Sequence, residues 1–346
     1  LIVRQALRPV QHLATAEHLR KGDESLFQLL IERKAFEKLL DSEEVFHRDG
    51  GLVYTLDMSP YAPALYFGDK YFCVEKDFNH IERYVQNIIF ICENYGIKSV
   101  ISLIDPELVL LSQYQGEFDK FGIKTILSDI RFTESTFDKY VFYQKYKDTI
   151  RLIPTVESYS EAHKMIESRE WSYPIFAKLR DGSASIGICK IDTEDDFAIT
   201  RNNDKYIYQP FIEGIEYGVD VYFDLISGEL ISVFIKRKLA MRAGETDKSI
   251  SVKSAKILSE ILKVGKISGI RGPVDVDVFV SNRGEVFINE INPRFGGGYP
   301  HAYQCGVNFM ELIMNNLKGI VNKPQFNNYE EDVILLKYSS SYLVKK

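Results

Sequence analysis

Two runs of alternating apolar residues near position 280 constrain the fold of this chain more than any other stretch. The runs are Val274–Val280 and Glu285–Ile291, and they flank the short polar link Ser281-Asn282-Arg283-Gly284. Period-two alternation on both sides of a short link that contains Gly is the signal of a β-hairpin. We therefore expect two antiparallel strands here.

Acidic and amide side chains occupy defined positions on this hairpin. Residues two apart on a strand face the same way, so Asp277 shares a face with Asp275, and Glu290 shares a face with Asn292. The link makes Asp277 and Glu290 candidate cross-strand neighbours. Asp277, Glu290 and Asn292 offer the hard oxygen ligands that suit Mg²⁺, which completes its coordination with phosphate oxygens. Arg294 can reach the same phosphates bidentately.

The alternative is an edge ribbon whose acidic side chains are simply solvated. Against it, Glu290 and Asn292 lie within an apolar run, and Arg294 and the glycines Gly296–Gly298 follow directly. This context favours a metal and phosphate site.

A second phosphate-binding candidate is Lys178, on the apolar strand expected over Tyr173–Leu179. An ammonium on such a strand needs an anionic partner or access to water, because its burial is costly. The loop Arg180–Gly187 follows, and its small residues allow backbone amides to approach an anion closely. Such a loop alone is often only a hairpin tip, but the Lys, the loop and the strand Ile188–Ile191 together favour phosphate binding.

The first half of the chain alternates between strands and helices. Strands are expected at Leu52–Asp57, Tyr71–Val74, Ser99–Ile104 and Lys124–Leu127, with helices at Asn79–Tyr95 and Glu107–Phe121. This alternation is typical of a parallel α/β sheet, whose strand carboxyl ends bind ligands. For Asp57 and Asp105, at two such ends, substrate contact and capping or turn formation are both open. Before this region, Glu24–Glu44 has helical periodicity.

The stretch Asn-Glu-Ile-Asn-Pro-Arg at 289–294 resembles the metal-binding strand of the ATP-grasp ligases, above all the stand-alone proteins similar to the carbamoyl-phosphate synthase large chain. The resemblance covers about Leu52 to Lys337. It implies an α/β (α+β) ATP-grasp fold in three parts: a parallel, Rossmann-like domain at 1–130 with residues 1–51 atypical, a linker helix and lid subdomain at 131–208, and an antiparallel-sheet catalytic base at 209–346.

The same resemblance implies a set of nucleotide contacts. Lys139 matches the Lys of an Asp-Lys pair that binds phosphates, although periodicity alone makes it only an exposed Lys in the helix expected over Thr136–Lys147. Glu216 would bind the ribose hydroxyls. The remaining implied contacts are the phosphate-binding residues Lys178, Ser183, Ala184 and Ser185 and the adenine-binding residues Gln209, Pro210, Phe211 and Ile212.

Residues 236–248 contain a local excess of cations in an acidic protein. A solvated basic loop is the plain interpretation, and the resemblance implies instead a mobile loop over the γ-phosphate. Lys236 and Arg242 are then expected, with Arg294, to contact phosphate or substrate, and Glu245 to hold the incoming amine. For His301, an acid/base role and a structural hydrogen-bonded role are both open.

The activity implied is ATP-dependent joining of a carboxylate to an amine-type nucleophile through an acylphosphate, with release of ADP and phosphate. ATP and Mg²⁺ are the implied cofactors, with two ions expected and Mn²⁺ as a substitute. Phosphorylation of bicarbonate or carbamate ranks second, because the chain carries one ATP-grasp unit where carbamoyl-phosphate synthase uses two. A non-catalytic nucleotide-binding module is disfavoured by the presence of the metal ligands.

Composition limits the partners. The formal net charge is -6, so neither nucleic acid nor an anionic membrane is expected to bind, and no apolar run approaches the length of a membrane span. The scattered cysteines, with no CxxC pair, favour reduced thiols in a cytoplasmic protein over a zinc site. We therefore expect small-molecule partners, namely ATP, a carboxylate and an amine, and by family analogy a homodimer.

Overall fold

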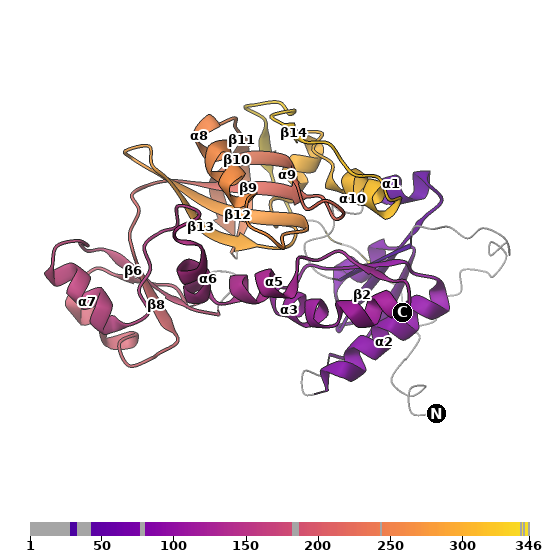
Figure 1. Ribbon diagram of the computed structural model, residues 1–346, viewed down its shortest axis with the longest axis horizontal. Helices are drawn as coiled ribbons and strands as arrows, with labels where there is room; N and C mark the ends of the chain where they lie inside the picture. The colour runs from indigo at the N-terminus through magenta and orange to yellow at the C-terminus, as the bar shows by residue number, and fades with distance from the viewer. Residues whose placement is uncertain are drawn as a thin grey trace. The chain divides into compact units, whose positions relative to one another are not determined.

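The computed structural model describes residues 28–32, 43–76, 80–181, 187–242, 244–339, 341 and 343–344. The chain divides into two compact units (Figure 1). The first comprises Leu1–Leu127, Phe309–Asn322 and Ser340–Lys346, and the second comprises Ser128–Asn308 and Lys323–Ser339. No helix among the described residues is long and apolar enough to cross a membrane.

The first unit contains a five-stranded sheet of order β3-β2-β1-β4-β5 in which every neighbouring pair is parallel. The strands are β1 (Gln28–Glu32), β2 (Leu52–Asp57), β3 (Lys70–Cys73), β4 (Ser99–Ser102) and β5 (Lys124–Thr125). The helices are α1 (Glu43–Arg48), η3 (Pro63–Phe67), α2 (Ile81–Tyr95), α3 (Asp105–Gln113), α4 (Gln115–Lys120) and α10 (Phe309–Leu317). The parallel α/β arrangement expected from the strand–helix alternation is confirmed.

One expectation in this unit is wrong. The helix predicted over Glu24–Glu44 is wrong at Gln28–Glu32, which form the strand β1 between β2 and β4; α1 starts at Glu43, and residues 24–27 and 33–42 lie outside the described residues. The continuous run Leu29-Leu30-Ile31 is typical of a central parallel strand, and its length does not distinguish it from a helical segment. The apolar residues Leu1-Ile2-Val3, which could end a first strand, lie outside the described residues.

Two acids are buried at the carboxyl edge of this sheet, Asp57 at 5% exposed and Glu107 at 1% exposed, and Glu107 is the one with a buried cation beside it. Its carboxylate accepts hydrogen bonds from Tyr84 Oη and Ser102 Oγ, both at 2.5 Å, and lies 3.1 Å from Lys76 Nζ. Burial raises the pKa of Glu107 to about 8 and lowers the pKa of Lys76 to about 8. Asp57 accepts a hydrogen bond from the Ser59 amide at 2.8 Å, which is a turn contact.

The second unit is built on a seven-stranded sheet of order β13-β12-β9-β10-β11-β15, antiparallel throughout this order, with β14 beside β10. The strands are β9 (Gly214–Phe223), β10 (Leu230–Arg242), β11 (Glu245–Ser251), β12 (Gly272–Ser281), β13 (Val286–Asn292), β14 (Gln325–Phe326) and β15 (Ile334–Leu336). Apolar residues of β9, β12 and β13 pack with Ile257 and Ile261 of α8 (Ala255–Val264) in one core. The short helix α9 (Tyr299–Gln304) follows the glycines.

The predicted hairpin is confirmed, with one irregularity. Asp277 pairs with Glu290 and Asp275 with Asn292, but Val278 pairs with Ile288, so Asn289 is an extra residue in β13. This β-bulge explains why both Ile288 and Ile291 are buried although they are three apart. It leaves Asn289 and Glu290 together outside the apolar core.

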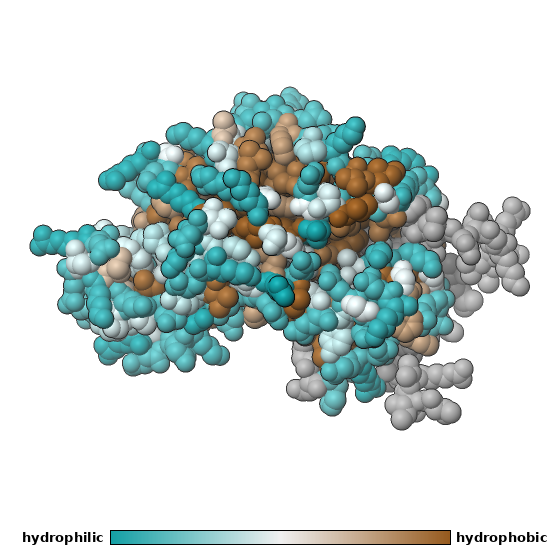
Figure 2. Space-filling view, in the orientation of Figure 1, coloured by the Kyte–Doolittle hydropathy of each residue, from teal (hydrophilic) through white to brown (hydrophobic). Residues whose placement is uncertain are grey.

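A smaller three-stranded antiparallel sheet of order β7-β6-β8 completes the second unit. It consists of β6 (Ile175–Leu179), β7 (Cys189–Ile191) and β8 (Tyr206–Pro210), with α7 (Tyr159–Glu167) and η4 (Glu194–Ile199). Phe197 and Tyr208 lie at the centre of its separate core. Figure 1 shows α7 beside β6 and β8, and hydrophilic side chains cover most of the face of this region seen in Figure 2.

Gly116, within α4, and Gly122, just after it, allow the contribution of local backbone geometry to stability to be measured. Gly122, just after α4, has φ +68°, whereas Gly116 lies within α4, and a Cβ at either position would meet nothing within 4 Å. We expect Gly122→Ala to lower the free energy of unfolding by about 1 kcal/mol, because only glycine adopts this φ without strain. Gly116→Ala is the control and should leave stability unchanged or slightly higher in chemical denaturation. Equal losses in both variants would contradict the backbone explanation.

Candidate active site

The site begins at the junction of α5 (Ile130–Phe137) and α6 (Lys139–Tyr146), where one continuous helix was expected over Thr136–Lys147. Asp138 breaks the helix and caps α6, accepting hydrogen bonds from the amides of Tyr140 at 2.9 Å and Val141 at 3.0 Å. Its carboxylate also binds the Arg180 guanidinium through Nε and Nη2, with the shortest contact 2.8 Å. The Lys139 amide donates to the Arg180 carbonyl at 3.0 Å, which fixes Lys139 against the end of β6.

Two lysines and the hairpin converge next to this junction. Lys139 Nζ lies 3.5 Å from Glu290 Oε1, and Lys178 Nζ donates to Asn289 Oδ1 at 3.0 Å. Burial lowers the pKa of Lys178, and the charge of Glu290 opposes this shift. The β-bulge therefore presents one side chain to each lysine, and Asn289 is a site residue that the sequence interpretation missed. The spacing of Val286, Ile288 and Ile291, first two and then three, was the available signal.

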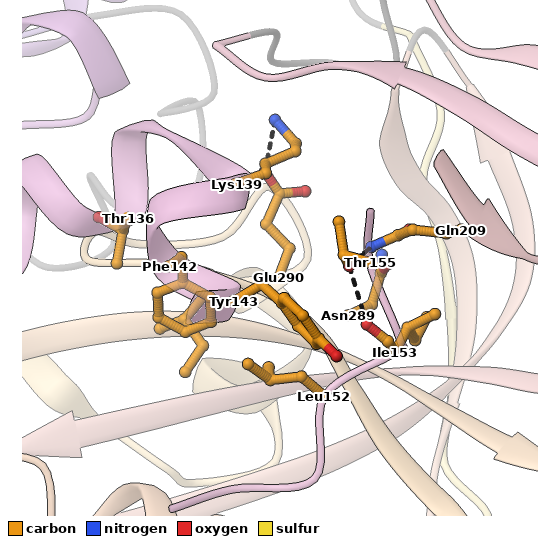
Figure 3. Close-up of a pocket in the computed structure, with 11 residues that line it drawn as sticks. Thr136, Lys139, Phe142, Tyr143, Leu152, Ile153, Thr155, Gln209, Asn289 and Glu290 are labelled. Carbon is orange, nitrogen blue, oxygen red and sulfur yellow. Dashed lines mark hydrogen bonds and ion pairs between the residues drawn. The ribbon is translucent and has the colours of Figure 1, made fainter. Parts of the chain in front are cut away.

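A pocket opens beside these contacts (Figure 3). Its polar side includes Lys139, Asn289 and Glu290, and Figure 3 shows the ion pair between Lys139 and Glu290. The remaining lining residues are Thr136, Phe142, Tyr143, Leu152, Ile153, Thr155, Gln209 and Ile291. One pocket thus offers an apolar surface for a flat ring and charged groups for anions.

Gln209 contributes a buried polar group to this pocket. Its side chain is 6% exposed, and its Nε2 donates to Thr155 Oγ1 at 2.9 Å. Among the described residues its Oε1 has no hydrogen-bond partner. A buried acceptor without a partner is costly, so this atom is suited to receive a donor from a bound molecule.

The other expected nucleotide contacts have different surroundings. Pro210 ends β8, Phe211 is 43% exposed with its ring centroid 5.7 Å from that of Phe176, and Ile212 is half-buried. Ser183, Ala184 and Ser185 lie outside the described residues. Glu216 lies on β9, which begins at Gly214.

Lys238 connects two of the expected site residues and was not singled out from the sequence. Its ammonium donates to Glu216 Oε1 and Asp277 Oδ1, both at 2.6 Å, and its side chain is only 6% exposed. Burial opposes the charge of Lys238, but the two carboxylates outweigh this and raise its pKa. Lys238 therefore remains an ammonium beside the proposed metal ligand Asp277.

The basic segment 236–248 is not a mobile loop; it forms the paired strands β10 and β11. Three of its five cations, at 236, 238 and 242, are an even number of residues apart, which is typical of one face of a strand. Lys236 is 1% exposed and bonded to Asp220, and Arg242 Nη2 lies 2.9 Å from Asp247 Oδ1. Glycine at 218 makes room for the stems, because a Cβ there would lie 3.1 Å from Lys236 Cε and 3.4 Å from Lys238 Cε.

The last part of the hairpin carries Arg294, whose Nη1 lies 3.3 Å from Asp275 Oδ2 and donates to the Phe295 carbonyl at 3.0 Å. Asn292 pairs with Asp275 across the strands. No three Asp, Glu, His or Cys side chains in the described part of the chain form a metal cage of their own. Asp277, Glu290 and Asn292 provide two carboxylates and one amide, a partial set of the kind that Mg²⁺ uses when phosphates supply the rest.

His301 is structural. It is 1% exposed, its Nε2 lies 3.0 Å from the Val333 carbonyl, and its Nδ1 lies 2.8 Å from Ser249 Oγ. Nε2–H must donate to the carbonyl, so Nδ1 accepts the Ser249 hydroxyl. Burial, with the charge of Lys236, lowers the pKa of His301 to about 4, so the imidazole is neutral.

Two family models match the chain. Residues 34–126 match the PylC-like N-terminal domain, and residues 136–298 match the ATP-grasp domain. The vancomycin B-type resistance protein VanB of Enterococcus faecalis is 25% identical over an alignment 226 residues long, which covers 58% of this chain and 66% of VanB. The D-alanine–D-alanine ligase of Sulfurimonas denitrificans is 29% identical over 219 residues, 58% of this chain and 62% of the ligase. The chain thus spans less than two thirds of these curated relatives.

Solved structures share the fold at low identity. N5-carboxyaminoimidazole synthetase of Staphylococcus aureus complexed with ADP has a TM-score of 0.69 at 16% identity, covering 90% of this chain and 80% of that one. Biotin carboxylase of Campylobacter jejuni has a TM-score of 0.69 at 15% identity, covering 89% of this chain and 74% of that one. At these identities the likeness shows the fold alone.

The burial of neutral His301 predicts a pH-dependent stability. Its pKa is lower in the folded than in the unfolded chain, so the unfolded chain binds the extra proton between about pH 6.5 and pH 4. Stability should be complete above that range and decrease as the pH falls, by up to about 3 kcal/mol from this group.

His301→Gln should flatten the pH dependence of the free energy of unfolding measured by denaturant titration at pH 7.5, 6 and 5. His163→Gln is the control, because the side chain of His163 is 34% exposed, and it should keep the wild-type slope. A wild-type slope in His301→Gln would contradict the assignment.

Proposed function

The chain carries an ATP-grasp domain at residues 136–298 behind a PylC-like N-terminal domain, and from this premise we propose that the protein is an ATP- and Mg²⁺-dependent ligase. In the proposed reaction a substrate carboxylate takes the γ-phosphoryl group of ATP and becomes an acylphosphate. An amine-type nucleophile then forms the carbon–nitrogen bond and displaces phosphate.

One observation carries the proposal: Lys139 of α6 and Glu290 of β13 form an ion pair in a pocket whose other side is apolar, and Lys178 of β6 donates to Asn289, which lines the same pocket. A nucleotide has the matching two parts, a flat base and a charged phosphate chain. Gln209 Oε1 offers an acceptor for an exocyclic amine of the base. Glu216 is the proposed ribose ligand.

The proposed metal ligands are Asp277, Glu290 and Asn292, with two Mg²⁺ ions in the working site and Mn²⁺ as a substitute. When bound, the ions neutralise charge on the β- and γ-phosphates. Lys238 already holds Asp277 and Glu216 at 2.6 Å each, so it keeps these carboxylates in position and must share Asp277 with a metal. The donor set fits the ion.

The described side chains act mainly by position and charge, which is what phosphoryl transfer requires. Lys139 and Lys178 would bind phosphate oxygens, and Arg294, held by Asp275, would bind the transferred group. Lys236 and Arg242 lie on the strand β10 and not in a loop, so strand pairing would hold their positive charges in place before a ligand binds. Asp138 acts as a positioning residue for Lys139 through the cap of α6 and the pairing with Arg180.

The acceptor is proposed to be an organic carboxylate and the nucleophile an amine. The curated relatives include a D-alanine–D-alanine ligase, which by its name joins two amino acids. Bicarbonate and carbamate are tested as separate substrates in the same assay.

Glu290→Gln tests the metal and phosphate site. We expect ATP-dependent phosphate release, measured with Mg²⁺ over a panel of carboxylates with and without amines, to fall by at least about 100-fold, the loss typical of one preorganised electrostatic contact. EDTA should abolish release by the wild-type protein.

Glu285→Gln is the matched control, because Glu285 belongs to the same hairpin but pairs with exposed Arg151. It should retain wild-type release, and both variants should keep the wild-type melting temperature within a few degrees. Unchanged turnover in Glu290→Gln would remove Glu290 from the proposed site.

Lys178→Met should weaken binding of ADP, measured by isothermal titration calorimetry with Mg²⁺, by roughly 10-fold, or about 1.4 kcal/mol. Lys190→Met is the control on the same three-stranded sheet, because Lys190 is exposed and pairs with Asp192. Equal affinities for the two variants would contradict the phosphate role of Lys178.

A further inference from the structure

The β-bulge in β13 decides which way one polar side chain points. In a regular strand neighbouring residues face opposite sides of the sheet, so Asn289 would face the apolar core when Glu290 faces away from it. The extra residue removes this conflict. Ile288 and Ile291, on its two sides, are both buried. Asn289 and Glu290, between them, both line the pocket, so the bulge adds a second polar side chain to the site.

The three lysines around the hairpin differ in the charge of their partners. Lys139 lies 3.5 Å from the carboxylate of Glu290, and Lys238 donates to two carboxylates at 2.6 Å each. Lys178 instead donates to Oδ1 of Asn289 at 3.0 Å, and an amide oxygen carries no net charge. In the part of the chain that the structure describes, no carboxylate forms an ion pair with Lys178. Its ammonium is therefore held in place by a partner that does not neutralise it.

A neutral partner leaves Lys178 ready for an anion. An ammonium has three N–H donors, and the amide oxygen of Asn289 accepts one of them. A phosphate that binds Lys178 displaces no carboxylate, whereas a phosphate that binds Lys139 competes with Glu290. The hydrogen bond also orders the long side chain of Lys178 beforehand, so less conformational entropy is lost when a ligand binds.

We propose that Asn289 is a positioning residue for Lys178, and that its neutral side chain holds the ammonium for a phosphate group of the nucleotide without neutralising it. This inference rests on the proposed function and adds one residue to its nucleotide site. Asn289 acts through Lys178, so its effect on nucleotide binding should exist only while Lys178 is present.

A double-mutant cycle tests this dependence. Binding of ADP at saturating Mg²⁺ is measured by isothermal titration calorimetry in the wild-type protein, in Asn289→Ala, in Lys178→Met and in the double variant. Asn289→Ala alone should weaken ADP binding by about 5-fold, the effect of one hydrogen bond. In the Lys178→Met background the same substitution should change nothing, because the side chain through which it acts is absent.

Asn289→Asp separates the charge of the side chain from its shape. This variant keeps the size of the side chain and an acceptor for Lys178, but it gives the ammonium a carboxylate partner that the phosphates must displace. ADP binding should therefore weaken at least as much as in Asn289→Ala. A smaller loss than in Asn289→Ala would overturn the role of the neutral side chain.

Asn282→Ala is the matched control, because Asn282 lies in the turn of the same hairpin and is exposed. It should bind ADP as the wild-type protein does, and each variant should keep the wild-type melting temperature within a few degrees. Equal losses from Asn289→Ala in both backgrounds would overturn the positioning role. That comparison stays decisive even where the substitution disturbs the bulge, because a general disturbance would weaken binding with and without Lys178.

The outcomes also separate this inference from the proposed function. Weaker ADP binding in Lys178→Met with no loss in Asn289→Ala overturns the positioning role and leaves the phosphate role of Lys178 standing. Absence of ADP binding by the wild-type protein in the presence of Mg²⁺ overturns the ligase proposal and this inference together.

Discussion

The pairing of Asp277 with Glu290 across β12 and β13 is the constraint on which the rest of the site depends. Antiparallel register brings two carboxylates together, and charge repulsion would oppose this without nearby cations. Lys238 forms an ion pair with Asp277, and Lys139 forms an ion pair with Glu290. The bulge at Asn289 then aims a neutral acceptor at Lys178, so three lysines from β10, α6 and β6 are arranged around one hairpin.

This charge pattern extends across the sheet. Along β10 and β9, Lys236 bonds Asp220 and Lys238 bonds Glu216, and Gly218 between the two acids leaves room for both lysine stems. Buried ion pairs add little net stability, because desolvation offsets their attraction. Their value is geometric: each holds a charged group in a fixed position, so in the proposed ligase little reorganisation would be needed when phosphates and metal bind.

Most of the fold followed from periodicity. The hairpin and the parallel sheet of the first unit were expected, because the spacing of apolar residues reflects which side chains are buried. The failures share a cause. Gln28–Glu32 is too short for periodicity to separate strand from helix, and the strand at 236–242 was hidden by charges that pair across the sheet instead of facing water.

The candidate site residues likewise fall into those that the sequence could predict and those that it could not. Asp277 and Glu290 could be proposed from the alternation of the hairpin, and Lys139 from the resemblance to ATP-grasp proteins. Lys238 could not, because its candidate role depends on Glu216, which lies 22 residues away in sequence, and its position is not unusual for a surface lysine. The candidate role of such a lysine depends on which side chains the strand pairing brings next to it. The strand pairing of β10 with β9 and β11 therefore supplies the information that the one-dimensional pattern lacks.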